Sequence, residues 1–284
     1  MAANNNPTVA GRRLGTELRR LRKDSGLTGT QVAARLLISQ AKVSHMETGR
    51  RPVSPRDVRD LCRLYGVADR HVVDTLTALA KESSRQGWWR AYGDVPHSVY
   101  LDLETAAASI RLYGPLVIPG LLQTPAYAAS VIEETIPLLT VDQAAAQLRV
   151  RLRRQYRIYD PARRLHLRVV VDESVLRRVV GSREIMREQL EHLHALSTEP
   201  HIVVQVLPHS AGAHTGLSGQ FSVLEFPDSR EAVVYLKRFT SGLCLDKPSD
   251  VRQYGVTHAH LRARALTPEH SRDVITDAIK VFAS

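Results

Sequence analysis

Hydrophobic residues recur at helical spacing in five short segments of the first third of the chain. Leu14, Leu18 and Leu21 fall at i, i+4 and i+7 among arginines, which predicts an amphipathic helix with a basic outer face. Four further helical patterns follow, at 28–36, 39–49, 54–66 and 72–79. The spacing therefore predicts a small all-α domain.

Capping residues mark the ends of these helices. Thr28 with Gln31 has the spacing of a capping box. Ser54-Pro55-Arg56-Asp57 is a further start signal, with an N-cap, a proline at the first helical position and an acidic third residue. Glycines that can take a left-handed conformation predict the helix ends: Gly26, Gly49 and Gly66. Two short helices separated by a tight turn at 37–38 predict a helix-turn-helix.

The second helix of this pair, which starts at Ser39, has an apolar side and a polar side. Val43 and Met46 are three residues apart and predict its buried face. The other face carries short or bidentate side chains with little charge, which suit contacts with base edges: Gln40, Ala41, Ser44 and His45.

These residues are similar to the pattern of XRE-type, lambda-repressor-like helix-turn-helix domains. The similarity covers about residues 11 to 80 and is carried by Leu27-Thr28, Val32-Ala33, Leu36, Ser39, Val43-Ser44, Glu47 and Gly49. The resemblance implies that the helix from Ser39 lies in the major groove of double-stranded DNA. It also implies base contacts by the four exposed side chains, Gln40 first, and phosphate contacts by Thr28, Gln31, Lys42, Arg50 and Arg51.

One residue departs from the family pattern. Leu37 stands where the family usually has Gly or Asn in the turn before the recognition helix. A left-handed backbone would cost a leucine about 1–2 kcal/mol. The local turn is therefore open to a different conformation, even within the same fold.

Net charge agrees with binding to a phosphate backbone. The chain carries +10, and residues 1–86 hold 16 Lys and Arg against 8 Asp and Glu, a net of +8. A localised positive potential attracts nucleic acid, although an acidic protein or a membrane surface would also be attracted.

The remaining two thirds predict a second domain of a different class. We place the boundary at Gly87-Trp88-Trp89-Arg90, which gives domains 1–86 and 87–284. Alternating hydrophobic patterns predict strands at 165–171, 201–207, 220–226 and 232–237, the last two joined by the hairpin Pro227-Asp228-Ser229-Arg230. Helical patterns lie at 99–110, 124–132, 140–157, 182–196, 248–265 and 268–282. The fold expected is α+β, with a mostly antiparallel sheet.

Several segments here resemble the C-terminal domain of a large actinobacterial group of XRE-type proteins. They are Ile118–Thr124, Asp172–Arg178, Gln205–Pro208 with Gly212–His214, and Phe221–Pro227. The group is described as antitoxin-like regulators and includes WhiJ-type developmental regulators. The resemblance implies regulation of development or secondary metabolism, often with a small protein encoded nearby as partner.

Candidate catalytic and metal-binding residues do not form a convincing site in the sequence. Asp172 and Glu173 are adjacent and more readily cap the short helix that follows. His258 and His260 point apart on a helix, and Ser210 and Ser218 lack a nucleophile-elbow motif. We therefore expect no enzyme, no metal and no cofactor. The loop 208–219, with His209 and His214, is the best candidate for a ligand or partner contact.

Compartment and redox state follow from what the sequence lacks. No apolar run approaches the roughly 20 residues that span a bilayer, and the first residues lack a signal peptide. We expect a cytoplasmic protein without membrane association. Cys62 and Cys244 lie far apart in sequence and are expected to be buried thiols rather than a disulfide.

Three functional hypotheses remain open at this level. The main one is a sequence-specific transcriptional regulator that binds as a homodimer, because a single short helix contacts few bases. The second is an antitoxin-like protein that neutralises a small cognate partner and autoregulates through its helix-turn-helix. The third, a DNA-tethered enzyme, would require a bound metal or substrate.

Overall fold

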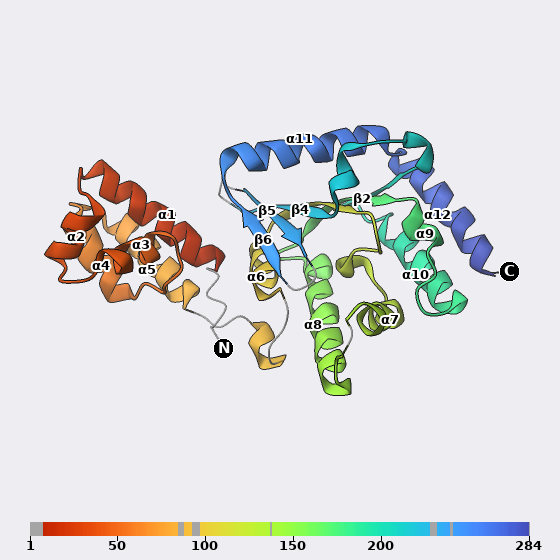
Figure 1. The fold of residues 1–284 in the computed structure, drawn as a ribbon, viewed down its shortest axis with the longest axis horizontal. Helices are drawn as coiled ribbons and strands as arrows, with labels where there is room; N and C mark the ends of the chain where they lie inside the picture. Colours follow the sequence, from red (N-terminus) through yellow and green to blue (C-terminus); the bar gives the residue numbers. More distant parts are fainter. Residues whose placement is uncertain are drawn as a thin grey trace. The chain divides into compact units, whose positions relative to one another are not determined.

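Contacts along the chain divide it into two units, residues 1–88 and 89–284 (Figure 1). The computed structural model describes residues 8–84, 88–92, 97–136, 138–227, 232–238 and 241–283. Each unit has its own hydrophobic core and is described by itself. The division lies two residues from the boundary placed on the sequence.

The described part of the first unit is all helical. Its helices are α1 (Val9–Asp24), α2 (Gly29–Arg35), α3 (Gln40–Glu47), α4 (Pro55–Leu64) and α5 (Arg70–Ser83). The expected capping box at Thr28 is formed, Ser54 caps α4 as expected, and Gly26, Gly49 and Gly66 have φ values of 70°, 68° and 75°. Leu14 and Leu18 of α1 pack in a core with Val32, Val43 and Leu61. The predicted all-α domain is therefore confirmed.

The second unit is an α+β fold built on a mixed sheet. Its helices are α6 (Ser98–Ala106), α7 (Pro125–Thr135), α8 (Val141–Tyr159), α9 (Ser174–Arg177), α10 (Arg183–Leu196), α11 (Pro248–Arg264) and α12 (Pro268–Ala283). Its strands are β1 (Ser109–Gly114), β2 (His166–Asp172), β3 (Ile202–Leu207), β4 (Phe221–Glu225), β5 (Ala232–Lys237) and β6 (Gly242–Leu245). Within the described residues the strand order is β3-β2-β1-β4-β5-β6. The β1–β2 and β2–β3 pairs are parallel and the other described pairs are antiparallel, so a mostly antiparallel sheet is confirmed.

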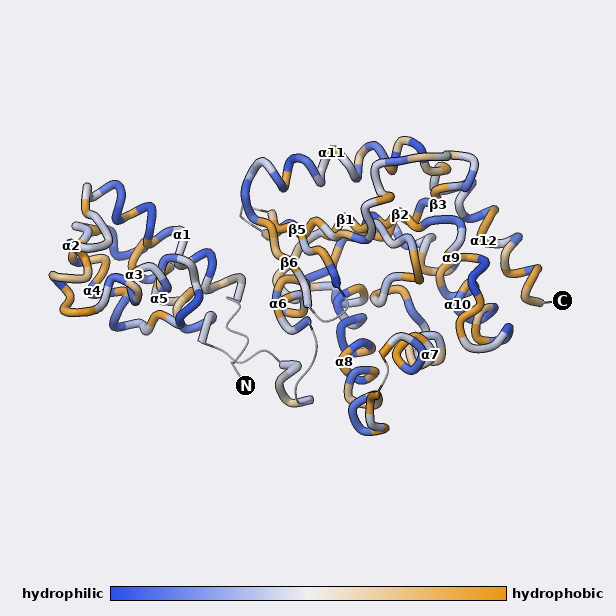
Figure 2. Tube along the Cα trace, in the orientation of Figure 1, coloured by the Kyte–Doolittle hydropathy of each residue, from blue (hydrophilic) through white to orange (hydrophobic). Residues whose placement is uncertain are grey.

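Helices cover both faces and one edge of this sheet. In Figure 1, α11 runs along one face, and α6 and α8 lie on the other side. Tyr113, Phe221 and Leu261 belong to the core under α11. Figure 2 shows that the strands carry long hydrophobic runs, as expected of strands buried on both faces.

The free edge of β3 is covered by Leu266 and by the first turn of α12. The Val206 N–H donates to the Ser271 hydroxyl at 2.9 Å, and the Leu266 N–H donates to the Val206 carbonyl at 2.9 Å. These bonds pair backbone groups that an edge strand would otherwise expose. The end of β3 is consequently held firmly against α12.

Two strands were not predicted. The helix expected over 99–110 ends at Ala106, and residues 109–114 form the strand β1 instead. Strand β1 pairs with β2 on one side and β4 on the other, so distant partners stabilise it rather than its own sequence. Strand β6 is four residues long, which is too short to show an alternating hydrophobic pattern in the sequence.

Smaller expectations had mixed outcomes. Strands β4 and β5 form the expected antiparallel pair, although the turn residues Asp228, Ser229 and Arg230 lie outside the described residues. Cys62 is buried as predicted, but Cys244 is only partly buried, because it lies on the edge strand β6. Among the described residues, no helix is both long and apolar enough to cross a membrane.

Candidate nucleic-acid interface

The helix-turn-helix consists of α2, a short turn and α3. Thr28 starts α2: its hydroxyl accepts the Gln31 N–H, and Gln31 Oε1 accepts the Thr28 N–H at 2.8 Å. The Ser39 hydroxyl starts α3 by accepting the Lys42 N–H at 3.1 Å. Gly49 ends α3 in a left-handed conformation. These contacts pair backbone groups that helix ends leave unsatisfied, and they fix both ends of α3.

Leu37 takes the left-handed conformation despite its side chain. Its φ is 54°, and its side chain is 92% exposed. The turn is therefore the one that suits Gly or Asn, and no alternative turn replaces it. Leu36 and Ile38 on either side pack against the core, and the Ile38 N–H donates to the Ala33 carbonyl at 3.0 Å. These contacts outweigh a strain of about 1–2 kcal/mol.

The amphipathic reading of α3 is confirmed by the burial of its side chains. Val43 and Met46 are 2% and 1% exposed. The opposite face is open to solvent and carries all four side chains expected to contact bases: Gln40, Ala41, Ser44 and His45. A carboxamide, a methyl, a hydroxyl and an imidazole thus share one surface, which matches what base-edge readout requires.

The residues expected to contact phosphates differ in exposure and in the contacts that they already make. Arg50 and Arg51, just after α3, are exposed. Thr28 and Gln31 are also exposed but use their oxygens in the capping box, so the donor that Gln31 presents is its amide NH₂. Lys42 is partly buried, and its Nζ lies 3.5 Å from a carboxylate oxygen of Asp57, which completes the capping box of α4 with Ser54. Lys42 thus ties α3 to α4 as well as adding charge.

Two residues that hold α3 in place were not singled out from the sequence. Arg22 of α1 forms a bidentate ion pair with Glu47, the last residue of α3. Gly15 of α1 faces the same end of α3, and a Cβ there would lie 2.7 Å from the Met46 carbonyl oxygen. The available signal was a glycine inside an amphipathic helix, which costs stability unless close packing requires it.

In the second unit, Asp172, Glu173 and His209 meet where the parallel strands β2 and β3 end. Asp172 Oδ1 accepts the N–H of Ser174 and starts α9, as expected. Glu173 Oε2 instead accepts the backbone N–H of His209 at 2.9 Å. The His209 ring lies 3.6 Å from Asp172 and 3.8 Å from Glu173. Both carboxylates were expected to cap the short helix; Asp172 does so, and the strand-to-helix junction also brings both carboxylates close to the His209 ring.

His214, the second candidate of the loop 208–219, has different neighbours. Its Nδ1 accepts the Gly216 N–H at 3.1 Å, and its ring packs edge-on against Tyr113 with centroids 5.9 Å apart. A Cβ at Gly216 would lie 2.5 Å from the Tyr113 ring, so the loop needs glycine there. The contacts of His209 and His214 thus anchor the loop at separate points.

The remaining histidine pair behaves as expected. His258 is 2% exposed and His260 is exposed, so they point apart on α11. Burial, with Arg111 nearby, lowers the pKa of His258 to about 4. Among the described residues, no three His, Cys, Asp or Glu side chains form a metal-binding group.

Two arginines of α8, Arg151 and Arg154, are directed toward the rest of the second unit. Arg154 Nε and Nη2 each donate to one carboxylate oxygen of Glu104 at 2.6 Å. The Glu104 side chain is only 2% exposed. Arg151 donates to Gln123 Oε1 at 2.9 Å, and burial, with Arg154 nearby, lowers its pKa to about 10. These charges stabilise the second unit internally rather than forming a solvated patch.

Comparison with known families agrees with this geometry. Residues 13–76 match a helix-turn-helix domain, so the chain is a helix-turn-helix DNA-binding regulator of the XRE-like class. Residues 98–277, more than half of the chain, match the family described as a domain of unknown function (DUF5753), and the chain belongs to that family. No curated protein and no solved structure matches the chain significantly.

Proposed function

We propose that this protein is a transcriptional regulator that binds a two-fold-related operator as a homodimer and reads bases with α3. The observation that carries the proposal is the exposed polar face of α3 above buried Val43 and Met46. We propose base contacts by Gln40, Ala41, Ser44 and His45, and phosphate contacts by Thr28, Gln31, Lys42, Arg50 and Arg51. The second unit provides dimerisation and receives a signal or partner.

The dimer follows from the length of the reading helix. Helix α3 has 8 residues and is about 12 Å long, roughly a third of one turn of DNA. One copy therefore contacts too few bases for genomic specificity, and two copies on half-sites a helical turn apart supply the rest. A strictly monomeric protein, in solution and on DNA by light scattering, would contradict the homodimer.

Base reading by Gln40 is tested by comparing specific with non-specific binding. A carboxamide pairs bidentately with adenine, so Gln40→Ala should cost about 1–3 kcal/mol on the operator and little on random DNA. Gln31→Ala is the matched control, because a phosphate contact is lost equally on both DNAs. Equal losses for Gln40→Ala on both DNAs would show that Gln40 does not read bases.

We place the protein in the cytoplasm, in the control of development or secondary metabolism, and without catalytic activity or cofactor. The strongest carboxylate candidates support the non-catalytic role, because Asp172 starts α9 and Glu173 holds Arg177 and the loop. Mapping genomic binding sites would test the biological assignment, since the neighbouring genes identify the target.

The alternative is an antitoxin-like role, in which the chain neutralises a small protein encoded nearby. One observation favours a protein partner: an apolar groove lies between α7 and α8, where Leu138 and Val141 are 99% and 86% exposed. Co-expression of the full chain with such a protein, followed by co-purification, tests this role. If the partner binds in this groove, Val141→Asp should abolish the complex. Val256→Asp, at an exposed position of α11, is the control and should keep it.

A further inference from the structure

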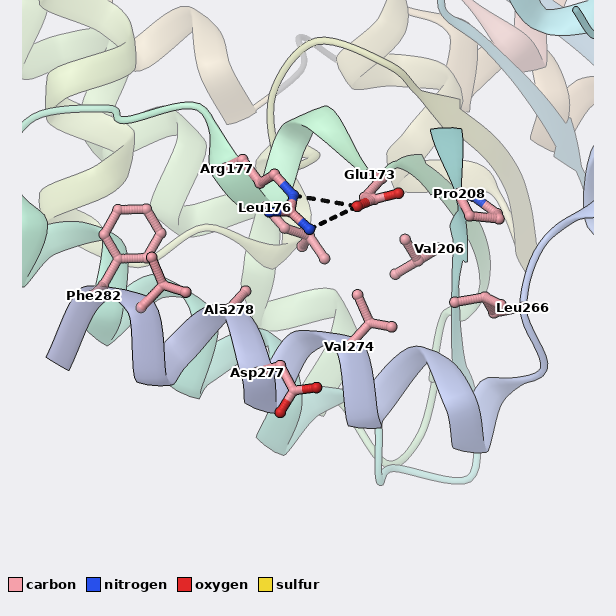
Figure 3. A pocket seen from close by; sticks show the side chains of 11 residues that line it. Glu173, Leu176, Arg177, Val206, Pro208, Leu266, Val274, Asp277, Ala278 and Phe282 are labelled. Atoms are coloured by element: carbon pink, nitrogen blue, oxygen red, sulfur yellow. Dashed lines mark hydrogen bonds and ion pairs between the residues drawn. The ribbon is translucent and has the colours of Figure 1, made fainter. Parts of the chain in front are cut away.

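An apolar pocket of about 320 Å³ lies between α9, the end of β3 and α12. Its walls come from Leu176 of α9, Val206 of β3, and Val274, Ala278 and Phe282 of α12. Figure 3 shows these side chains converging on one space, with Glu173 and Arg177 along the wall opposite α12. This volume lies within the range of small-molecule sites.

The pocket lies where open α/β sheets place their ligands. Strands β2 and β3 are parallel, and Glu173 and Pro208 follow directly after their carboxyl ends. Ligands of such sheets bind in the crevice outside these ends, where loops leave room. The hydrogen bonds of Val206 to Ser271 and Leu266 keep α12 against the strand, so the pocket is preformed on rigid elements.

The pocket is elongated. Val274, Ala278 and Phe282 are spaced at i, i+4 and i+8 on one face of α12, which extends about 12 Å along the helix axis. Val274 and Ala278 are only partly buried, so this face is not filled by the protein itself. A narrow chain or a row of rings fits such a shape better than a compact polar molecule.

One carboxylate faces the pocket, that of Glu173, and the guanidinium of Arg177 lines the same pocket. Asp277 lies at the rim, points away from the cavity in Figure 3, and forms an ion pair with Lys280 at 2.8 Å. Arg177 Nη2 already donates to Glu173 at 2.9 Å. The His209 backbone N–H, and then the Arg177 side chain, lower the pKa of Glu173 despite its burial, so this carboxylate is ionised at neutral pH. The lining therefore favours a cationic or donor group and repels an anionic one.

We propose that this pocket binds an elongated apolar small molecule with one amino group, its apolar body along α12 and its ammonium at Glu173. The inference rests on the proposed signal-receiving role of the second unit and specifies its ligand. Glu173 is one hydrogen bond from the loop 208–219, through the His209 N–H. Arg264 holds the same loop by donating to the carbonyls of Ala211 and Ala213. A ligand at Glu173 thus contacts the group that fixes the start of this loop.

The first test is calorimetric titration of the full chain with three matched probes. 4-Phenylbutylamine, 4-phenylbutan-1-ol and 4-phenylbutyrate share an apolar body and differ in head-group charge. We expect the amine to bind most tightly and the carboxylate at least tenfold more weakly. Equal binding of all three probes, tighter binding of the carboxylate, or no binding of the amine would overturn the proposal.

Two variants locate the binding site. Ala278→Phe fills the space beside α12 and should abolish amine binding, whereas Ala259→Phe on the exposed side of α11 should not change it. Glu173→Gln keeps an acceptor for the His209 N–H but removes the charge. This substitution should weaken binding of the amine about tenfold and leave binding of the alcohol nearly unchanged. Unchanged amine affinity in Glu173→Gln would contradict the charge contact even if Ala278→Phe failed to fold.

A DNA-binding assay separates this inference from the proposed function. If the amine binds the pocket and does not change operator affinity, the pocket is supported and the signal-receiving role is wrong. If the chain binds its operator and no probe enters the pocket, the ligand inference is wrong and the regulator remains. The two proposals therefore fail independently.

Discussion

Arg22 and Glu47 join the first helix of the chain to the end of the recognition helix. Arg22 Nε lies 2.5 Å from Glu47 Oε1, and Arg22 Nη2 lies 3.0 Å from Oε2. The two side chains are only 14% and 10% exposed, and the Arg22 guanidinium also donates to the Leu27 carbonyl. The hydrogen bond to Glu47 raises the pKa of Arg22, so the guanidinium keeps its charge. It fixes the direction in which α3 presents its polar face.

Replacing Arg22 with Met should destabilise the first unit by about 3 kcal/mol, because Glu47 would keep a nearly buried charge without its partner. Chemical denaturation monitored by circular dichroism measures this loss. Arg20→Gln is the control: Arg20 pairs with Glu17 and Asp24 at the exposed surface, where the expected cost is below about 1 kcal/mol. Equal losses in the two variants would show that the Arg22–Glu47 pair has no special role.

Leu37 offers a stabilising substitution. Its φ of 54° strains a leucine, and its 92% exposed side chain contributes little packing. Leu37→Gly should therefore raise the free energy of unfolding of the first unit by about 1 kcal/mol. Gly26→Ala is the converse substitution. Gly26 has a φ of 70°, and a Cβ there would meet no other atom, so backbone strain alone should destabilise that variant by about 1 kcal/mol. A destabilised Leu37→Gly variant would mean that the leucine side chain stabilises the turn.

Local signals were sufficient for most of the first unit. Thr28, Ser39 and Ser54 each cap the helix that the sequence predicted, because a capping hydrogen bond connects residues three apart. Val43 and Met46 likewise identify the buried face of α3 from spacing alone. Contacts between helices were not predictable in this way, since nothing near Gly15 in sequence indicates the backbone of Glu47.

Long-range pairing explains what was missed in the second unit. Residues 109–114 become a central strand only because β2 and β4, both distant in sequence, pair with them. The approach of His209 to Asp172 and Glu173 depends on the parallel register of β2 and β3. The period of a single segment carries no information about such partners.

Phosphate contacts predict a specific salt dependence. Arg50 and Arg51 are exposed beside α3 and should position the protein on DNA without selecting bases. Replacing either with Ala should weaken binding to operator and random DNA alike, and should reduce the slope of log K against log salt by about 1. Arg187→Ala, on the exposed side of α10 in the second unit, is the control and should keep the slope. An unchanged slope in Arg50→Ala and Arg51→Ala would contradict their phosphate contacts.

Buried His258 and partly buried His97 should make the second unit sensitive to acid. Burial, with Lys237 and Arg154 nearby, lowers the pKa of His97 to about 4, and the His258 pKa is similarly about 4. An unfolded histidine titrates near pH 6.5, so between about pH 6.5 and 4 the unfolded chain binds protons that the folded chain excludes. Stability is therefore full above pH 6.5 and falls as the pH decreases through this window.

His97→Asn should reduce this pH dependence. Asparagine does not titrate and tolerates the left-handed backbone of His97, whose φ is 61°. Urea unfolding of the full chain at pH 7 and pH 5 measures the effect in a range where ordinary carboxylates stay ionised. We expect a smaller loss between the two pH values in His97→Asn than in the unsubstituted chain, and an unchanged loss in His260→Asn, because His260 is exposed on α11. The same loss in all three proteins would show that protonation of His97 does not destabilise the second unit.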